Sequence, residues 1–183
     1  MKTTQWHVIT GAPCSGKTTV IKKLEDNGFQ VVHETARAYI DTELKKGKSI
    51  EEIKRNELSF EWHILNKKVA IENRLPLTDT VFLDRAVPDS IAYYRLSGLD
   101  PSVPIKFSRR FHYRSIFLFD RLIFETDAVR SENDRIAVRL EKLLEDSYKM
   151  IGYPIIRVPL MSVSARVDYL LSKIQVKTNK SRF

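Results

Sequence analysis

The chain has 183 residues, with 31 Lys and Arg against 23 Asp and Glu, and its formal net charge is +8. This length predicts one domain over residues 1–183, and no run of 18 apolar residues is present that could form a membrane-spanning helix. The single cysteine excludes an internal disulfide, and the first apolar run begins too early for a signal peptide, so we expect a cytoplasmic protein.

The first predicted element is a strand over residues 6–10, which leads into a glycine-rich loop. Residues 11–19 read GAPCSGKTT and match G-x-x-x-x-G-K-[ST], the pattern of a phosphate-binding loop. An apolar run enters the loop and an amphipathic run over 19–27 leaves it. This is the strand–loop–helix context that the pattern requires, so an ordinary glycine-rich turn is the less favoured interpretation.

The spacing within this loop assigns a role to each residue type. Gly11 and Gly16 allow consecutive backbone N–H groups to point at one anion. Lys17 supplies a positive charge for the β- and γ-phosphates, and Thr18 offers a hydroxyl to Mg²⁺. The predicted nucleotide-binding residues are Gly11, Ala12, Pro13, Cys14, Ser15, Gly16, Lys17, Thr18 and Thr19.

Short apolar runs that do not alternate with polar residues predict strands buried on both faces. Helical patterns lie between them, among them a helix expected from Ser49 toward Arg74 and a last helix that starts at Ser162 or Ser164. Alternating strands and helices predict an α/β fold with a parallel sheet, whose ligands bind at the carboxyl ends of the strands. The five predicted strands cover residues 6–10, 29–33, 80–83, 115–119 and 154–158.

Glu34 and Arg37 follow the second predicted strand. A carboxylate at this edge can accept a proton from a substrate hydroxyl or orient it, and Arg37 can reach an anionic or hydroxylated substrate. The alternative is that Glu34 only stabilises the start of the next helix. We favour the substrate-binding role for both residues.

Asp84, Arg85 and Asp89 follow the third predicted strand. Asp84 ends an apolar run in the manner of a Walker B strand, so it would hold Mg²⁺ opposite Thr18 or act as the catalytic base. Arg85 could clamp phosphate or substrate. Asp89 follows a proline and precedes a helix, and helix capping and substrate contact are equal alternatives for it.

Residues 121–133 follow the fourth predicted strand and are expected to form a lid. A lid excludes water and brings an arginine to the charge that develops during phosphoryl transfer. Arg130 is the first candidate for that arginine and Arg121 the second. A surface loop with weak charge pairs is the alternative.

These motifs together resemble a family of small P-loop ATPase and kinase domains of the AAA type, related to the ribosylnicotinamide kinase domain and to nucleoside kinases. The resemblance implies a three-layer nucleoside-kinase-like fold with a five-stranded parallel sheet in the order 2-3-1-4-5, ATP as donor and Mg²⁺ as cofactor. It implies substrate-side roles for Glu34, Arg37, Asp84 and Arg85, and the lid role for Arg130. The segments that carry it are GAPCSGKTT, VHETARAY over 32–39, FLDR over 82–85 with PDS over 88–90, DAVRSE over 127–132 and VSARV over 163–167.

The resulting hypothesis is a Mg-ATP-dependent kinase that transfers the γ-phosphoryl group to a hydroxyl of a nucleoside-like or other small acceptor, as a monomer or homodimer. The alternative is a P-loop ATPase that acts as a switch or sensor for a protein partner. Two basic runs would also suit nucleic acid, but solvated helix faces and a basic tail explain them more simply. These runs are Lys106, Arg109, Arg110 and Arg114, and Lys173, Lys177, Lys180 and Arg182.

Overall fold

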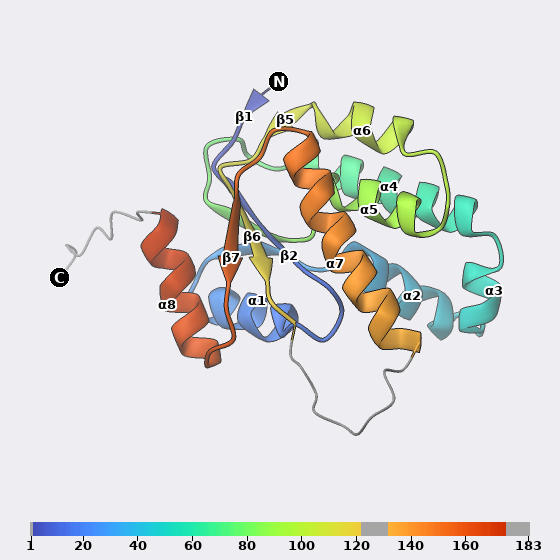
Figure 1. Ribbon diagram of the computed structural model, residues 1–183, viewed down its shortest axis with the longest axis horizontal. Helices are drawn as coiled ribbons and strands as arrows, with labels where there is room; N and C mark the ends of the chain where they lie inside the picture. The colour runs from blue at the N-terminus through green and yellow to red at the C-terminus, as the bar shows by residue number, and fades with distance from the viewer. Residues whose placement is uncertain (1, 122–131, 175–183) are drawn as a thin grey trace.

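The structure is a computed structural model that describes residues 2–121 and 132–174. Helices and strands alternate along most of this length (Figure 1). The strands are β1 (Lys2–Thr3), β2 (Trp6–Thr10), β3 (Gln30–Val32), β4 (Val81–Asp84), β5 (Phe111–His112), β6 (Ser115–Phe119) and β7 (Ile155–Val158). The helices are α1 (Lys17–Asp26), α2 (Thr35–Lys45), α3 (Ile50–Lys54), α4 (Glu57–Glu72), α5 (Asp89–Leu96), α6 (Ser102–Ser108), α7 (Glu132–Met150) and α8 (Val163–Ile174).

Five parallel strands form the main sheet in the order β3-β4-β2-β6-β7. Numbered along the chain, these five strands have the expected order 2-3-1-4-5. The central strand β2 is buried over its whole length, and Val8 lies opposite Leu83 on one side and Ile116 on the other. The pair formed by β1 and β5 is an addition that the sequence did not predict.

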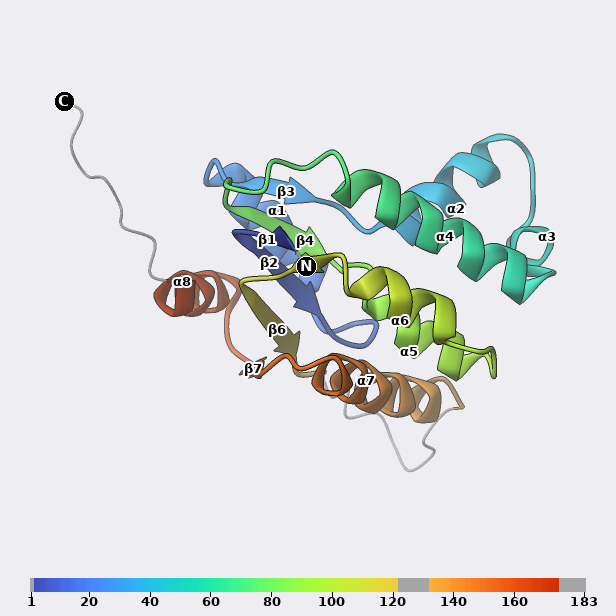
Figure 2. The ribbon, with the colours of Figure 1, turned by 90° about the horizontal axis from the view of Figure 1, so that it is seen from above.

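Helices cover both faces of the main sheet, so the fold has three layers (Figures 1 and 2). Ile9 and Phe82 point to the face covered by α1 and α8, where Leu24 and Leu170 complete one core cluster. The next residues along the strands point to the opposite face, where α5 and α7 pack against them and against each other. This alternation explains why both faces of each strand are apolar in the sequence.

The helix expected from Ser49 toward Arg74 is in fact two helices, which corrects the prediction. The capping box is present, because the Ser49 hydroxyl accepts from the Glu52 N–H and the Glu52 carboxylate accepts from the Ser49 N–H. The chain then turns at Asn56, whose extended backbone and side-chain bond to the Ser59 N–H start α4. The Asn56 side chain thus caps a new helix and interrupts the single helix that the apolar pattern predicted. At the last helix, Ser162 rather than Ser164 precedes the first turn and accepts from the Ala165 N–H.

Within residues 2–121 and 132–174, none of the helices combines the length and apolar character needed to cross a membrane.

A buried carboxylate ties α4 to the segment after β4. Glu72, the last residue of α4, is 2% exposed. Its Oε1 accepts from the Val87 N–H at 2.8 Å, and its Oε2 accepts from the Tyr113 hydroxyl at 2.8 Å. Glu72 therefore fixes the loop that carries Arg85 against the end of α4 and the segment before β6.

Replacing Glu72 tests this anchor through its pH dependence. Burial raises the pKa of Glu72 to about 7, whereas a Glu in an unfolded chain titrates near about 4.3. Between these values the folded protein keeps a proton that the unfolded chain releases, so its free energy of unfolding falls as the pH rises. The variant Glu72→Gln has no group that titrates at this position. The free energy of unfolding of the variant minus that of the parent protein should therefore increase from about pH 5 to about pH 8. Denaturant unfolding at each pH measures this difference.

Glu145→Gln is the matched control. Hydrogen bonds from Lys149 and Arg157 lower the pKa of Glu145 against a smaller effect of burial. The contribution of the Glu145 carboxylate to stability is lost only as the pH falls through the acid range. The difference in free energy of unfolding between Glu145→Gln and the parent protein should therefore stay constant from about pH 5 to about pH 8. A flat difference for Glu72→Gln as well would contradict the assignment.

Candidate active site

Two glycines shape the loop between β2 and α1. Gly11 has a φ of 141°, and a Cβ at this position would lie 2.7 Å from the carbonyl oxygen of Phe119. Gly16 has a φ of 81°, and a Cβ there would lie 2.9 Å from Nη1 of Arg166. Only glycine fits both positions, so the loop curls tightly around its own backbone N–H groups.

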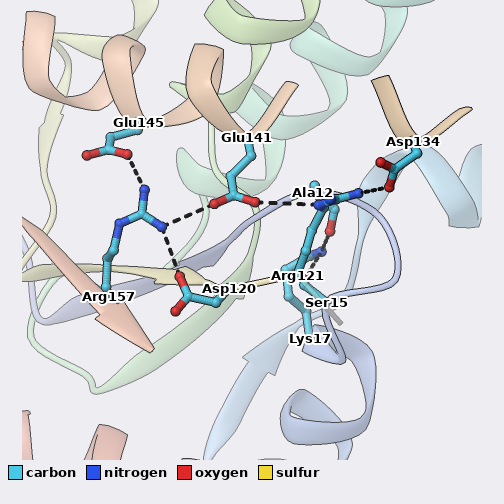
Figure 3. A network of polar contacts seen from close by, with 9 residues as sticks. All are labelled: Ala12, Ser15, Lys17, Asp120, Arg121, Asp134, Glu141, Glu145 and Arg157. Atoms are coloured by element: carbon cyan, nitrogen blue, oxygen red, sulfur yellow. Dashed lines mark hydrogen bonds and ion pairs between the residues drawn. The ribbon is translucent and has the colours of Figure 1, made fainter. Parts of the chain in front are cut away.

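Lys17 begins α1 and is buried. Its Nζ donates to the Ala12 carbonyl oxygen at 2.7 Å and to the Ser15 hydroxyl at 3.0 Å (Figure 3). Burial, and then the nearby Arg85, lower the pKa of Lys17 to about 7. An anion in the loop would restore the charge of this ammonium group. Pro13, Cys14, Thr18 and Thr19 are exposed along the same loop and first helical turn.

Arg85 lies at the centre of the site. Its backbone is left-handed, with a φ of 67°, and its side chain is 3% exposed. Its Nε donates to Oε1 of Glu34 at 3.0 Å, and its Nη1 lies 3.4 Å from Oδ1 of Asp89. The guanidinium also lies 5.4 Å from the centre of the Tyr93 ring. These contacts hold the guanidinium in one orientation, which suits a phosphate clamp.

The surroundings of Asp89 fit neither of the two predicted roles, which were helix capping and substrate contact. It is 0% exposed and accepts from the Thr10 hydroxyl at 2.6 Å, the Ala86 N–H at 2.9 Å and the Tyr148 hydroxyl at 2.5 Å. Pro88, not Asp89, holds the N-cap position of α5. Because its oxygens are occupied by protein donors and sealed from solvent, Asp89 positions Arg85 and is not disposed to contact a substrate.

Glu34 occupies the N-cap position of α2, but its side chain makes no capping bond. The carboxylate points instead to Arg85 and is a quarter exposed. Burial would raise the pKa of Glu34, but Arg85, Lys17 and Lys68 together outweigh burial and lower it. The group is therefore an ionised carboxylate with one open side. The carboxylate therefore makes its ion pair with Arg85 rather than a hydrogen bond to the first turn of α2.

Asp84 ends β4 and fits the role of a magnesium residue. It is 2% exposed, and its Oδ1 has no hydrogen-bond partner among the described residues. Burial raises the pKa of Asp84 to about 6. A buried carboxylate oxygen without a protein donor, near the loop that carries Thr18, suits a cation that keeps most of its water and binds phosphate as well. In the described part of the chain, His, Cys, Asp and Glu form no denser metal-binding group.

One cavity of about 970 Å³ is lined by the phosphate-binding loop, Glu34 and Arg85, whereas Asp84 and Asp89 are not among the described residues that line it. It starts at the phosphate-binding loop, passes Glu34 and Arg85, and continues between α2, α4 and α5. Figure 2 shows that these helices lie together at one end of the molecule. Arg37 lines the cavity as predicted. Glu61 and Lys68 of α4 line it too. The sequence analysis assigned them no role, because they lie in a helix whose apolar residues indicated core packing.

The segment after β6 is described only at its two ends. Arg121 forms ion pairs with Asp134 and Glu141, and Arg157 forms ion pairs with Asp120, Glu141 and Glu145 (Figure 3). Arg130 and most of the predicted lid lie outside the described residues. Arg121 is thus tied to α7.

Sequence reasoning also missed Arg166 of α8. Its Nη1 donates to the Ser15 carbonyl oxygen at 2.6 Å, and its Nε donates to the Pro159 carbonyl oxygen at 3.2 Å. Arg166 therefore links the phosphate-binding loop to the segment that follows β7. Its guanidinium lies 5.1 Å from the centre of the Phe119 ring. A single arginine among apolar helix positions carried no sequence signal for this role.

Known proteins share this architecture. The model of a family described as AAA domain matches residues 6–166, and no curated protein matches the chain. The structure of NadR protein in complex with NR is similar, with a TM-score of 0.71 and 14% identity over 98% of this chain and 54% of that chain. This chain therefore spans about half the length of NadR.

Two shorter kinases are similar over nearly their whole length. Deoxyadenosine kinase from M. mycoides has a TM-score of 0.64 and 14% identity, over 92% of this chain and 97% of the kinase. Thymidylate kinase from Ehrlichia chaffeensis has a TM-score of 0.66 and 15% identity, over 96% of this chain and 100% of the kinase. These similarities show a common fold, and the family model spans most of the sequence. The chain therefore belongs to the AAA domain family and has the fold of the small P-loop kinases.

Proposed function

We propose that the protein is a Mg-ATP-dependent kinase that phosphorylates a hydroxyl of a small, nucleoside-like acceptor. One observation carries the proposal: a single cavity joins the phosphate-binding loop to an open carboxylate, Glu34, and continues well beyond it. A protein that only hydrolyses ATP needs no further room on that side. Such continuity between donor and acceptor sites is what direct phosphoryl transfer requires.

The loop would bind the donor. Its backbone N–H groups and Lys17 hold the phosphates, and the pKa of Lys17 rises back when the phosphate oxygens approach. Thr18 and Asp84 would hold Mg²⁺, which would supply positive charge to the phosphates of the donor. Both Asp84 and Lys17 are buried, so solvent screens their charges only weakly.

The part of the cavity on the side of Glu34 would bind the acceptor. Glu34 orients the acceptor hydroxyl and takes its proton while the oxygen forms a bond to the γ-phosphorus. The bond from that phosphorus to the bridging oxygen breaks, and ADP leaves. Arg85 lies against Glu34 and acts electrostatically on Lys17, so its charge stabilises the transferring group. Asp84 remains the alternative base, and Arg130 remains the proposed lid arginine.

The alternative is an ATPase that serves as a switch for a protein partner, with water as the acceptor. ADP formation that needs no added acceptor and changes with a partner would favour it. A screen of nucleosides, nucleotides and phosphorylated sugars, followed by ³¹P NMR of the products, separates the two because a kinase yields a phosphorylated acceptor.

Lys17→Ala should abolish turnover and leave the fold intact. The variant loses the ammonium that faces the phosphates, while burial of a methyl group on α1 does not disturb the core. Turnover is measured by ADP release in a coupled assay, and the fold by thermal unfolding. Lys22→Ala, an exposed position on the same helix, is the matched control and should keep full activity. Retained turnover in Lys17→Ala would refute the assignment of the loop.

Asp84→Asn should raise the Mg²⁺ concentration required for half-maximal ATP turnover by about tenfold or more, since a neutral amide is a weaker magnesium ligand. Calorimetric binding of ATP in the presence of EDTA should stay unchanged, because Lys17 and the loop remain. Asp79→Asn, an exposed position ahead of β4, should alter neither quantity. An unchanged Mg²⁺ dependence in Asp84→Asn would exclude this residue from the metal site.

A further inference from the structure

Two oppositely charged side chains of α4 face the cavity, and neither has an ion-pair partner in the described part of the chain. Glu61 is 7% exposed and Lys68 is 5% exposed, and both line the cavity. They are seven residues apart, so they lie on the same side of α4, separated by about 10 Å along the helix axis. The two charges act on each other through space, but no ion pair joins them.

Lys68 has unused hydrogen-bond donors. Its Nζ donates to the Ser90 hydroxyl at 3.3 Å and lies 6.0 Å from the centre of the Tyr93 ring. An ammonium group has three N–H donors, so donors remain for oxygen atoms of an occupant. Burial lowers the pKa of Lys68, with Arg85 adding to the effect against Asp89. An occupant with oxygen substituents would offset this burial.

Glu61 has hydrogen-bond acceptors that no donor of the described residues uses. Its carboxylate accepts no hydrogen bond from any residue in the described ranges, and burial raises its pKa. A carboxylate that is only 7% exposed and accepts no bond from the described part of the protein has lost part of its hydration, which costs free energy. An occupant that brings N–H groups to this point would remove that cost.

Shared contacts give the order of the two residues along the cavity. The Lys68 Nζ and the Arg85 guanidinium both lie over the Tyr93 ring, 6.0 Å and 5.4 Å from its centre. Arg85 also donates to Glu34, the proposed partner of the acceptor hydroxyl. Glu61 lies about two helical turns nearer the start of α4, next to Phe60, whose ring centre is 5.8 Å from the Lys54 Nζ. Lys68 therefore lies close to Arg85, and Glu61 lies toward the start of α4.

The wall between the two charges is apolar. Ile64 lies between Glu61 and Lys68 on α4 and is 3% exposed. Ile40 and Leu44 of α2 line the same cavity. Such a wall suits a flat ring, with polar groups at its two ends.

We infer that Glu61 and Lys68 select the acceptor, and that its class is nucleosides whose base carries an amino group. Lys68 bonds the oxygen atoms of the sugar, and Glu61 accepts from the amino group of the base. A base with a carbonyl oxygen in that position would leave Glu61 without a donor and place two oxygens together. This inference rests on the proposed kinase function, because it identifies the acceptor of the same site.

Binding measurements test the inference without turnover. The protein is saturated with Mg²⁺ and a non-hydrolysable ATP analogue, and two pairs of nucleosides are titrated by calorimetry: cytidine with uridine, and adenosine with inosine. In at least one pair the amino member should bind about 10- to 100-fold more tightly, as expected for hydrogen bonds to a charged acceptor.

The decisive variant is Glu61→Gln. Its amide can donate to a carbonyl oxygen as well as accept from an amino group, so the preference within the pair should fall to about threefold or less. Glu51→Gln makes the same chemical change at an exposed position of α3 outside the cavity, and it should keep the preference of the parent protein.

Lys68→Met tests the other contact. Loss of the ammonium should weaken both members of a pair by about tenfold and leave their ratio unchanged. Affinity for the ATP analogue should not change. Lys67→Met, at the exposed neighbouring position, should leave all affinities as they are. Thermal unfolding confirms that each variant is folded.

Several results would overturn the inference. They are equal binding within both pairs, no binding of any of the four nucleosides, an unchanged preference in Glu61→Gln, or loss of the ATP analogue in Lys68→Met. Each of these leaves the kinase proposal in place if another acceptor is phosphorylated. Absence of ATP binding by the parent protein removes the kinase proposal, and the inference with it.

Discussion

The buried pairing of Arg85 with Asp89 is the constraint on which the site depends. Asp89 accepts from Thr10 at the end of β2 and from Tyr148 of α7, and it contacts Arg85 just after β4. One carboxylate thus joins the central strand, a covering helix and the segment that follows β4. A buried charge pair contributes little net stability, but removal of one partner leaves the other unpaired at high cost. The pair therefore fixes the position of Arg85 more than it stabilises the fold.

The ionisable groups around this pair are shifted in a consistent way. Burial lowers the pKa of Lys17 and raises the pKa of Asp84, so each group is held away from its charged form. Glu34, which has Arg85 beside it, is shifted toward its charged form instead. Glu34 has Arg85 as its partner, whereas a phosphate beside Lys17 and a cation beside Asp84 would return those two groups to their charged forms. This difference matches a site that receives a polyanion and a cation together at one end and a neutral hydroxyl at the other.

The sequence predicted the five strands of the main sheet and the phosphate-binding loop, and the resemblance to small P-loop kinases implied the order of the strands, which the structure confirms. The strands and the loop depend on short apolar runs and on glycines whose neighbours are close in sequence. The division of one helix into α3 and α4 was missed, because the cap at Asn56 competes with an apolar pattern that continues across it. The β1–β5 pair was missed as well, because two residues per strand give no periodicity.

The polar side of the site was harder to predict. Glu34, Arg85 and Asp84 were found because they follow strands, and parallel strands bring such residues to one edge. Asp89 follows the same rule, yet the structure buries it under Tyr148, which lies 59 residues away in the chain. Glu61 and Lys68 follow no strand, so only the packing of α4 over the cavity reveals them. Contacts between distant segments decide these cases, and a single sequence does not display them.

Arg166 gives the phosphate-binding loop a dependence on the order of synthesis. The donor for the Ser15 carbonyl comes from a residue 151 positions later in the chain. During translation the loop leaves the ribosome before Arg166 has been made. A nascent chain therefore presents a glycine-rich turn that lacks this contact until α8 has been synthesised and packs beside α1, so the loop is supported only long after its own residues have been joined.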